Sequence, residues 1–422
     1  LVGLRPLSDV PRQPLEAMLL PAQIRNRASI ALPGVVALGA WQSRALPWSQ
    51  ARLAVRRLAE ERGLAWIRAL QGPNGGIEEC QLMAGFVFMG LEMAGPGTGD
   101  DIQRGCVNYL LETRRADGSW PTDRDLEIAV TGYAIHALAE FGDVSREPRL
   151  EPTRDWLLST QWRKPYDPLG QPAGGWSWAV PSGWPESEDT AVVLTSLALL
   201  GMTRVDPSIR LGVRWLLRQQ NRNGSWAEWI PGASQLFDGA CPGVTAHVVM
   251  ALRRPEVHDG RGHALSRALR YFAKSQAPDG SFSSLWFRDR THGTAKVLEA
   301  YADIGRPGDP VAALARRWLL DSQRADGGWP GKVEEPPPDG GTAEETAWAL
   351  YSLLRAGQPA GGEQMARAVR WLVDHQDGDG TWKPSAVGLY YPTMYYSDDL
   401  IAHCYSLRAL GRWLKSAREA GR

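Results

Sequence analysis

The sequence lacks the features that mark several large classes of protein. Its 47 Lys and Arg residues equal its 47 Asp and Glu residues, so no net field draws in nucleic acid or an anionic membrane. It has no basic stripe interleaved with aromatic residues. The longest early apolar run, residues 30–41, is too short to span a bilayer, and no signal peptide is visible. We therefore expect a cytoplasmic protein with no nucleic-acid partner and with any membrane contact peripheral.

Cysteine is scarce as well. The four residues Cys80, Cys106, Cys241 and Cys404 stand far apart without CxxC spacing, which predicts free buried thiols in a reducing compartment. The chain begins with Leu1 and not with Met, so we expect an upstream segment that this sequence does not include.

Tryptophan, in contrast, is abundant, with 19 copies placed in a repeat. The repeat of about fifty residues is an amphipathic outer helix, then Q-x-x-x-G-[SG]-[WF], a loop and an apolar inner helix. The copies lie at residues 66–77, 109–120, 215–226, 271–282, 318–329 and 371–382, with one more from residue 156 that carries an insertion. Arg114 and Ile77 break the pattern in two of them. Each hairpin needs neighbours to bury its apolar face.

The turn of this repeat has a local logic. We expect its Gly to supply the positive φ that ends the outer helix. We expect its Gln amide to bind backbone groups of the loop or of a helix end. The aromatic ring should stack on that amide and serve a structural role through its buried area.

The hairpins predict an all-α fold. Inner helices are expected at residues 126–141, 188–200, 243–252, 291–304, 343–354 and 397–410. Six such hairpins close into an (α/α)6 barrel, and residues 81–93 would form a seventh that belongs to a different domain. We therefore predict a partial, truncated barrel-like α domain over residues 1–120 and the (α/α)6 barrel over residues 121–422.

Three carboxylates, Glu186, Glu188 and Asp189, stand at the start of a nearly all-apolar helix. Acidic residues are stabilised at a helix start, so one interpretation is that Glu188 or Asp189 caps this helix. Three tryptophans lie just before them in the sequence: Trp176, Trp178 and Trp184. Because aromatic faces stabilise cations, acids that can donate a proton beside such rings make a candidate reaction site.

These repeats are similar to the QW motifs of the terpenoid cyclases, and the chain resembles squalene–hopene cyclases over nearly its whole length. GGWSW and PESEDTAVV correspond to the family's aromatic GG turn and its DxDDTAVV motif. Similar stretches follow in the family's order: VTAHVVMAL (244–252), HGTAKVLEA (292–300), TAWALYSLLRAG (346–357) and LRALGRW (407–413).

The resemblance implies a class II cyclase, in which a carboxylic acid protonates a linear isoprenoid and carbocations cyclise in an aromatic cavity. It implies that Glu188 donates the proton, that His247 contacts it, and that Glu186 and Asp189 keep it protonated. The aromatic positions it implies for the substrate are Trp178, Trp184, Trp229, Trp286, Tyr390 and Tyr395. It implies no metal and no other cofactor, with Mg²⁺ expected only if the substrate is a diphosphate.

The sequence departs from the family at the acids and at the cavity mouth. ESED replaces DxDD, and a displacement of about 1 Å can cost about 100-fold in rate. Arg288, Arg290 and Asp398 suggest a more polar mouth that binds a charged substrate group. The alternative is that the arginines belong to a surface set of ion pairs.

Two other functions stay open on the sequence. A non-catalytic isoprenoid-binding or scaffold protein would explain the altered acids. A prenyltransferase β-subunit has the same barrel and needs a zinc site of Asp, Cys and His. The stretch ending in Cys404-Tyr405 resembles that family, but Ala402 stands in the place of its zinc histidine.

The front of the chain is short for the family, since residues 1–120 resemble only the rear part of its second helical domain. Apolar faces at residues 30–38 and 82–93 would then lack neighbours, and large exposed patches usually bind something. We expect a second copy, a partner chain or an N-terminal segment outside this sequence to cover them.

Overall fold

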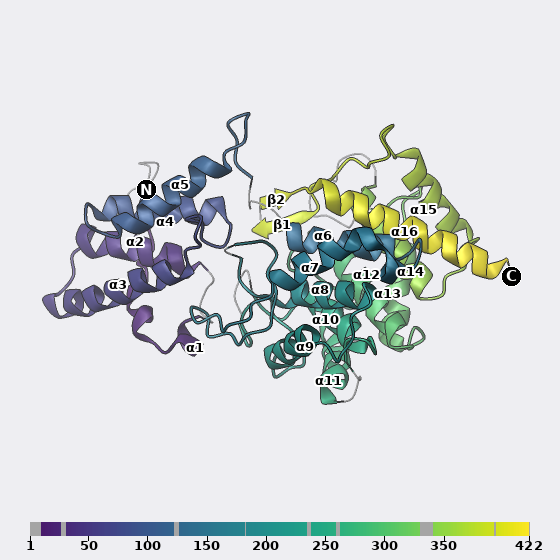
Figure 1. The fold of residues 1–422 in the computed structure, drawn as a ribbon, viewed down its shortest axis with the longest axis horizontal. Helices are drawn as coiled ribbons and strands as arrows, with labels where there is room; N and C mark the ends of the chain where they lie inside the picture. Colours follow the sequence, from purple (N-terminus) through teal and green to yellow (C-terminus); the bar gives the residue numbers. More distant parts are fainter. Residues whose placement is uncertain are drawn as a thin grey trace. The chain divides into compact units, whose positions relative to one another are not determined.

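The computed structural model describes residues 10–26, 31–121, 126–181, 183–233, 238–258, 262–329, 341–391 and 394–421. The chain divides into two compact units (Figure 1). The first comprises Leu1–Glu127 with the loop segments Lys164–Pro172 and Ser177–Pro185. The second comprises Ile128–Arg163, Ala173–Trp176 and Glu186–Arg422.

The first unit is helical. Its elements are η2 (Leu15–Leu19), α1 (Ala22–Arg25), α2 (Leu32–Ala45), α3 (Gln50–Leu70), α4 (Gln81–Ala94) and α5 (Asp100–Thr113). Helices α2 and α4 pack so closely that a Cβ at Gly90 would lie 2.8 Å from Ala37 Cβ. The expectation that their apolar faces lack neighbours is therefore met only in part among the described residues: the two helices bury one face of each other, whereas Phe86 of α4 stays 38% exposed. A covering chain or copy stays a prediction, and residue 30 lies outside the described residues.

The second unit is a barrel with two layers of helices. Its inner helices are α6 (Glu127–Leu138), α8 (Ser187–Leu199), α10 (Pro242–Arg253), α12 (Thr291–Asp303), α14 (Ala343–Arg355) and α16 (Asp399–Ala420). Its outer helices are α7 (Glu151–Ser159), α9 (Pro207–Gln219), α11 (His263–Ser275), α13 (Pro310–Asp321) and α15 (Glu363–Asp374). The expected inner helices are confirmed to within a few residues, except that α16 continues to Ala420, ten residues beyond its expected end at residue 410.

The inner helices form a closed ring. From α8 to α16 each one packs against the next (Figure 1). Helix α6 joins α8 through a 3.1 Å contact between His136 Nε2 and Ser196 Oγ. The ring closes where Arg412 of α16 forms a 2.9 Å ion pair with Glu140, just beyond α6. The second unit is thus a barrel of the (α/α)6 type, with six inner and five outer helices among the described residues, and the first is a smaller helical unit.

Short elements complete the chain. Two 3₁₀ helices, η3 (Val144–Arg146) and η4 (Pro148–Leu150), precede α7. A tyrosine-rich hairpin of β1 (Gly388–Tyr391) and β2 (Met394–Tyr396), which the sequence did not predict, precedes α16. Among the described residues, every helix is too short or too polar to cross a membrane.

In five of the turns the glutamine joins two successive hairpins. Gln220 Nε2 donates one bond of 2.9 Å to Gly224 O in its own turn and another of 2.9 Å to Ala264 O, in the first turn of the next outer helix. The same pair of bonds recurs at Gln71, Gln161, Gln276 and Gln323. Gly224 has φ of 97°, and a Cβ there would lie 2.3 Å from Arg267 O. The turn therefore needs glycine for its backbone conformation and for its close approach to the next helix.

The tryptophan of each turn ties the outer helix to the inner one. Trp226 Nε1 donates to Leu216 O at 2.7 Å, which satisfies a carbonyl near the end of the outer helix. The Trp226 backbone N–H donates to Thr245 Oγ1 at 3.0 Å, at the start of the inner helix. Trp176 and Trp329 make the equivalent pairs of bonds. These rings are fully buried, as their expected structural role requires.

The two-sided glutamine bond predicts a measurable loss of stability. Replacing Gln276 by Met should lower the free energy of unfolding by about 1–3 kcal/mol, because it leaves the Gly280 and Val311 carbonyls without their donor. The matched control is Gln376→Met. Among the described residues the exposed Gln376 Nε2 bonds only Gly380 O, so this loss should be smaller. Urea denaturation measures both, and equal losses would contradict the role of the second bond.

Candidate active site

The three acids of the ESED stretch are buried at the start of α8. Glu186, Glu188 and Asp189 are 5%, 6% and 3% exposed. The preceding turn holds them, because the Glu186 N–H donates to Trp176 O at 2.8 Å. Thr190 Oγ1 donates to Glu186 O at 2.5 Å from one turn further along the helix. The Gly-Gly-Trp turn thus fixes where the acids enter the barrel.

A fourth carboxylate, Glu228, caps α8. The Glu188 N–H donates to Glu228 Oε1 at 2.8 Å, and the Ser187 N–H donates to Glu228 O at 2.9 Å. The N-cap residue Glu186 makes no side-chain capping bond. The interpretation that Glu188 or Asp189 caps this helix is therefore wrong. A side chain from the following repeat takes that role and leaves their carboxyl groups for other contacts.

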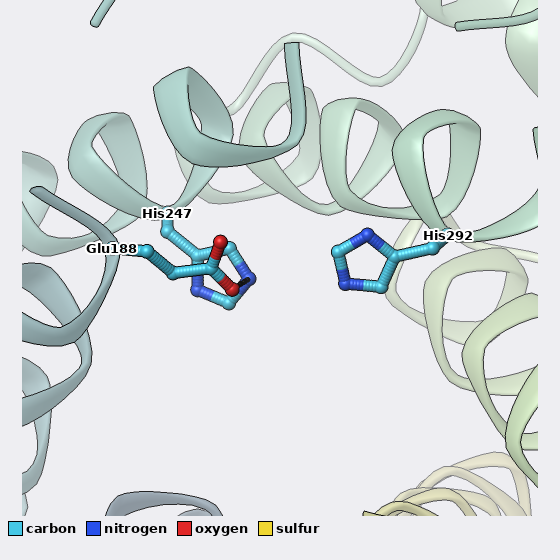
Figure 2. Close-up of side chains that lie close together, drawn as sticks. All are labelled: Glu188, His247 and His292. Carbon is cyan, nitrogen blue, oxygen red and sulfur yellow. Dashed lines mark ion pairs between the residues drawn. The ribbon is translucent and has the colours of Figure 1, made fainter. Parts of the chain in front are cut away.

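Glu188 lies between residues of the two neighbouring inner helices. Its Oε1 is 3.4 Å from His247 Nε2 of α10 and accepts a hydrogen bond of 3.3 Å from the Tyr133 hydroxyl of α6. Figure 2 shows the carboxyl group and the imidazole in contact. The structure thus brings together Glu188 and His247, which are 59 positions apart in the sequence.

Burial controls the protonation of this pair. Burial, followed by the charge of Asp189, raises the pKa of Glu188 to about 8. Burial, followed by the charge of Lys296, lowers the pKa of His247 well below its ordinary value. At neutral pH a protonated carboxylic acid therefore faces a neutral imidazole. Burial also raises the pKa of Glu186 and of Glu228 well above their ordinary values, so the carboxyl groups retain protons as a cluster.

The sequence analysis did not predict a role for Glu228, although its position relative to the turn aromatic could have indicated one. It stands two residues after Trp226, just as Trp178 follows Trp176 and Ser284 follows Phe282. Its Oε2 accepts a bond of 3.0 Å from Trp286 Nε1. The buried Asp238 holds this loop, because its carboxylate oxygens accept from the N–H groups of Glu228 at 2.8 Å and Ile230 at 2.9 Å. Burial raises the pKa of Asp238 to about 7.

His292 of α12 faces the same space from the opposite side (Figure 2). Its Nδ1 lies 3.1 Å from Ser284 Oγ, which fixes the ring. One ligand atom each of Glu188, His247 and His292 lie within 4.8 Å of one another, so these groups could hold a metal ion. The set contains no cysteine and so differs from the zinc ligands of a prenyltransferase. The expected absence of a metal stays a prediction.

A buried cation, Lys296, lies close to the acids. Its Nζ is 2.9 Å from Glu299 Oε1 and 4.6 Å from the centroid of the Tyr405 ring. That ring in turn lies 4.9 Å from the Tyr133 ring, whose hydroxyl binds Glu188. Lys296 follows His292 by four positions in HGTAK, which places both on one face of a helix, a spacing that could have identified it.

The predicted aromatic residues are placed differently from one another. Trp229 and Trp286 form a T-shaped pair with ring centroids 5.3 Å apart, next to Glu228. Trp178 and Trp184 are buried in the segment Ser177–Pro185, which groups with the first unit. Tyr395 is 51% exposed in β2. The Tyr390 side chain lies outside the described residues.

The predicted charged residues make local contacts. Arg288 Nε is 3.5 Å from Asp289 Oδ2, and Arg290 Nη1 donates to Ser281 Oγ at 3.2 Å. Asp398 caps α16 by accepting from the Ile401 N–H at 2.9 Å. The Arg288 and Asp289 side chains are only 13% and 6% exposed, so their pair is not the surface ion pair of the alternative interpretation, and a role for Arg288 in substrate binding stays a prediction.

Sequence comparison identifies relatives of the barrel. The family profile of the squalene-hopene cyclase C-terminal domain matches residues 127–415. Squalene–hopene cyclase of Bradyrhizobium diazoefficiens is 31% identical over 328 residues, which are 67% of this chain and 48% of that protein. The enzyme of Alicyclobacillus acidocaldarius is 30% identical over 393 residues, 85% of this chain and 62% of that protein. The chain thus spans less than two thirds of the length of these curated relatives.

Solved structures share the fold. The ent-copalyl diphosphate synthase from Streptomyces platensis is 22% identical, covers 90% of this chain and 75% of its own, and has a TM-score of 0.57. The type II terpene cyclase MstE from Scytonema is 20% identical, covers 72% of this chain and 94% of its own, and has a TM-score of 0.54. At these identities the likeness concerns the helical fold alone.

The raised pKa of Glu188 predicts how stability changes with pH. The folded pKa of about 8 exceeds the ordinary 4.5, so the stability that the bound proton contributes is present below pH 4.5 and is lost as pH rises to 8. Glu188→Gln removes this loss, so its stability relative to wild type should increase across that range. Denaturant titrations at several pH values measure the difference. The exposed Glu151→Gln serves as control, and an equal pH dependence of Glu188→Gln and wild type would contradict the assignment.

Proposed function

Because this chain belongs to the family of the squalene–hopene cyclase C-terminal domain, we propose that it is a class II terpene cyclase in which Glu188 protonates a linear isoprenoid. The observation that carries the proposal is the buried Glu188 carboxyl group, 3.4 Å from His247 Nε2 at the start of an inner helix. Its raised pKa keeps the proton on the acid at neutral pH, where an exposed glutamate would have lost it.

The chemistry begins with one proton transfer. The π electrons of a terminal alkene, or a lone pair of an epoxide oxygen, take the Glu188 proton, and the carboxylate remains on the enzyme. The next alkene of the chain attacks the cationic carbon, which forms a ring and moves the positive charge along the polyene. Loss of a proton from the last cation ends the sequence. No net oxidation or reduction occurs, and Glu188 must regain a proton before the next turnover.

The surrounding groups support each part of this scheme. The hydrogen bond from Tyr133 and the charge of Lys296 both favour the carboxylate that forms when Glu188 gives up its proton. His247 orients the acid from the other side. Trp229 and Trp286 offer aromatic faces that can stabilise a cation near the cluster. We infer an aromatic-lined cavity from these rings.

One solved structure with a similar fold suggests a class of substrate to test. One structure of MstE from Scytonema contains geranylgeranyl dihydroxybenzoate as substrate. We propose a linear isoprenoid for this chain, and a panel of such compounds that differ in length and head group would identify it by mass spectrometry of the products.

Substitution of the acid tests the proposal. Glu188→Gln keeps the size of the side chain but removes the acidic proton, so turnover should fall by at least about 100- to 10,000-fold. Glu188→Asp restores the family's residue with a shorter reach and should also lose activity if the cavity has adapted to Glu. Product formation is measured by mass spectrometry, with circular dichroism to verify the fold.

The matched control is Glu344→Gln. Glu344 is also fully buried at the start of an inner helix, where it accepts a bond of 2.8 Å from the Ser385 N–H. It has no place in the proposed reaction, so turnover should persist in this variant. Equal product from wild type and Glu188→Gln would reject the proposal and favour a non-catalytic isoprenoid-binding protein.

A further inference from the structure

A polar pocket lies inside the barrel, at the carboxyl-terminal ends of inner helices. It has a volume of about 210 Å³. Leu199 of α8, Asp303 of α12 and Arg355 of α14, each the last residue of its helix, line it. His247 also lines it, but none of the four carboxyl groups of the acid site does. The pocket is therefore a separate site that shares one side chain with the acid site.

The lining carries an excess of positive charge. Its cations are Arg254, Arg355, Arg408, Arg412 and Lys415, and its carboxylates are Glu140 and Asp303. Arg412 pairs with Glu140 at 2.9 Å, and Arg355 pairs with Asp303. Both carboxylates that line the pocket are thus already engaged.

The remaining cations do not all find a carboxylate. Arg408 lies 3.5 Å from Glu299, which Lys296 already binds at 2.9 Å. In the described part of the chain, Arg254 and Lys415 have no carboxylate within ion-pair distance. The buried Nε atoms of Arg254, Arg408 and Arg412 have no acceptor among the described residues. Buried donors without a partner cost free energy, so these groups favour a ligand that brings oxygen acceptors and negative charge.

The carboxyl-terminal ends of the helices explain only part of the excess of cations in the pocket. Carbonyl groups at helix carboxyl termini carry partial negative charge and stabilise nearby cations. That effect is confined to the last turn, whereas Arg408 and Arg412 lie in the middle of α16, far from its end at Ala420. A helix end therefore does not account for the two cations that α16 directs into the pocket.

We propose that this pocket binds a compact oxyanion of the phosphate or diphosphate class. Guanidinium groups bind such oxyanions through paired, charge-assisted hydrogen bonds. A phosphoryl group carries about −1.5 to −2 charge at pH 7 and can pair with the half-buried Arg254 and with the exposed Lys415. The volume is below the roughly 300 Å³ at which pockets begin to hold drug-sized ligands, so it fits an anionic group and not a polyene.

Isothermal titration calorimetry of the full chain tests this at constant ionic strength. The probes are inorganic phosphate, inorganic diphosphate and geranyl diphosphate. Arg254→Gln combined with Lys415→Gln removes the two cations without carboxylates and should raise Kd by about tenfold or more, without breaking an observed ion pair. Arg253→Gln is the matched control, because it removes an exposed arginine at the adjacent position of the same helix end. This variant should bind as wild type does.

The probes distinguish the source of the anion. Tighter binding of geranyl diphosphate than of inorganic diphosphate would assign the site to the head group of an isoprenoid, and equal binding would assign it to a free anion. Thr195→Phe fills the pocket from α8 without changing its charge and should also abolish binding. Absence of binding by every probe, or an unchanged Kd in both the double variant and Thr195→Phe, would overturn the proposal. Because the readout is binding, it does not depend on turnover by Glu188.

Discussion

The side-chain amide of each turn glutamine is the contact on which the barrel depends. One NH₂ group reaches both a carbonyl of its own turn and a carbonyl of the next outer helix, as Gln220 does with Gly224 and Ala264. Each of these hairpins is thereby placed relative to its successor through the outer layer. The same turns place two side chains that support the site, since Glu228 and Ser284 both follow the turn aromatic by two residues and bind the start of α8 and His292. The inner helices supply the acid and the residues around it.

The protonation of the acid site follows from the burial of several carboxyl groups close together, away from water. Glu186, Glu188, Asp189 and Glu228 are all buried, and the charge of Lys296 is shared with Glu299. Desolvation and mutual repulsion then favour the protonated forms. The free N–H groups at the start of α8 would otherwise attract the carboxylates of the first turn of α8. Glu228 binds these N–H groups instead. The helix is capped from outside, and Glu188 remains available to face His247 and Tyr133.

Local pattern and repeat spacing predict the fold well. The inner helices, the positive-φ glycine and a backbone partner for the glutamine amide followed from the sequence, because they are properties of one hairpin, whereas the second amide bond reaches the next hairpin and was not predicted. The contacts of Glu188 depend on neighbouring helices, so the sequence predicted His247 through a family resemblance and did not predict Tyr133 or Lys296. The packing of α2 on α4 was missed because two apolar helices without a repeat partner gave no sign that they cover each other.

The contacts that close the ring between α6 and α16 differ in type from those that link successive hairpins. Glutamine amides link successive outer helices from α7 to α15, whereas α6 and α16 meet through the Arg412–Glu140 ion pair and the ring contact between Tyr133 and Tyr405. Contacts between the first and last segments of a domain join parts that are distant along the chain, and closing so long a loop costs more chain entropy than forming a local contact. The contact between α6 and α16 is consequently the place where the barrel opens most easily. We expect amide hydrogens along these two helices to exchange with solvent before those of the helices between them.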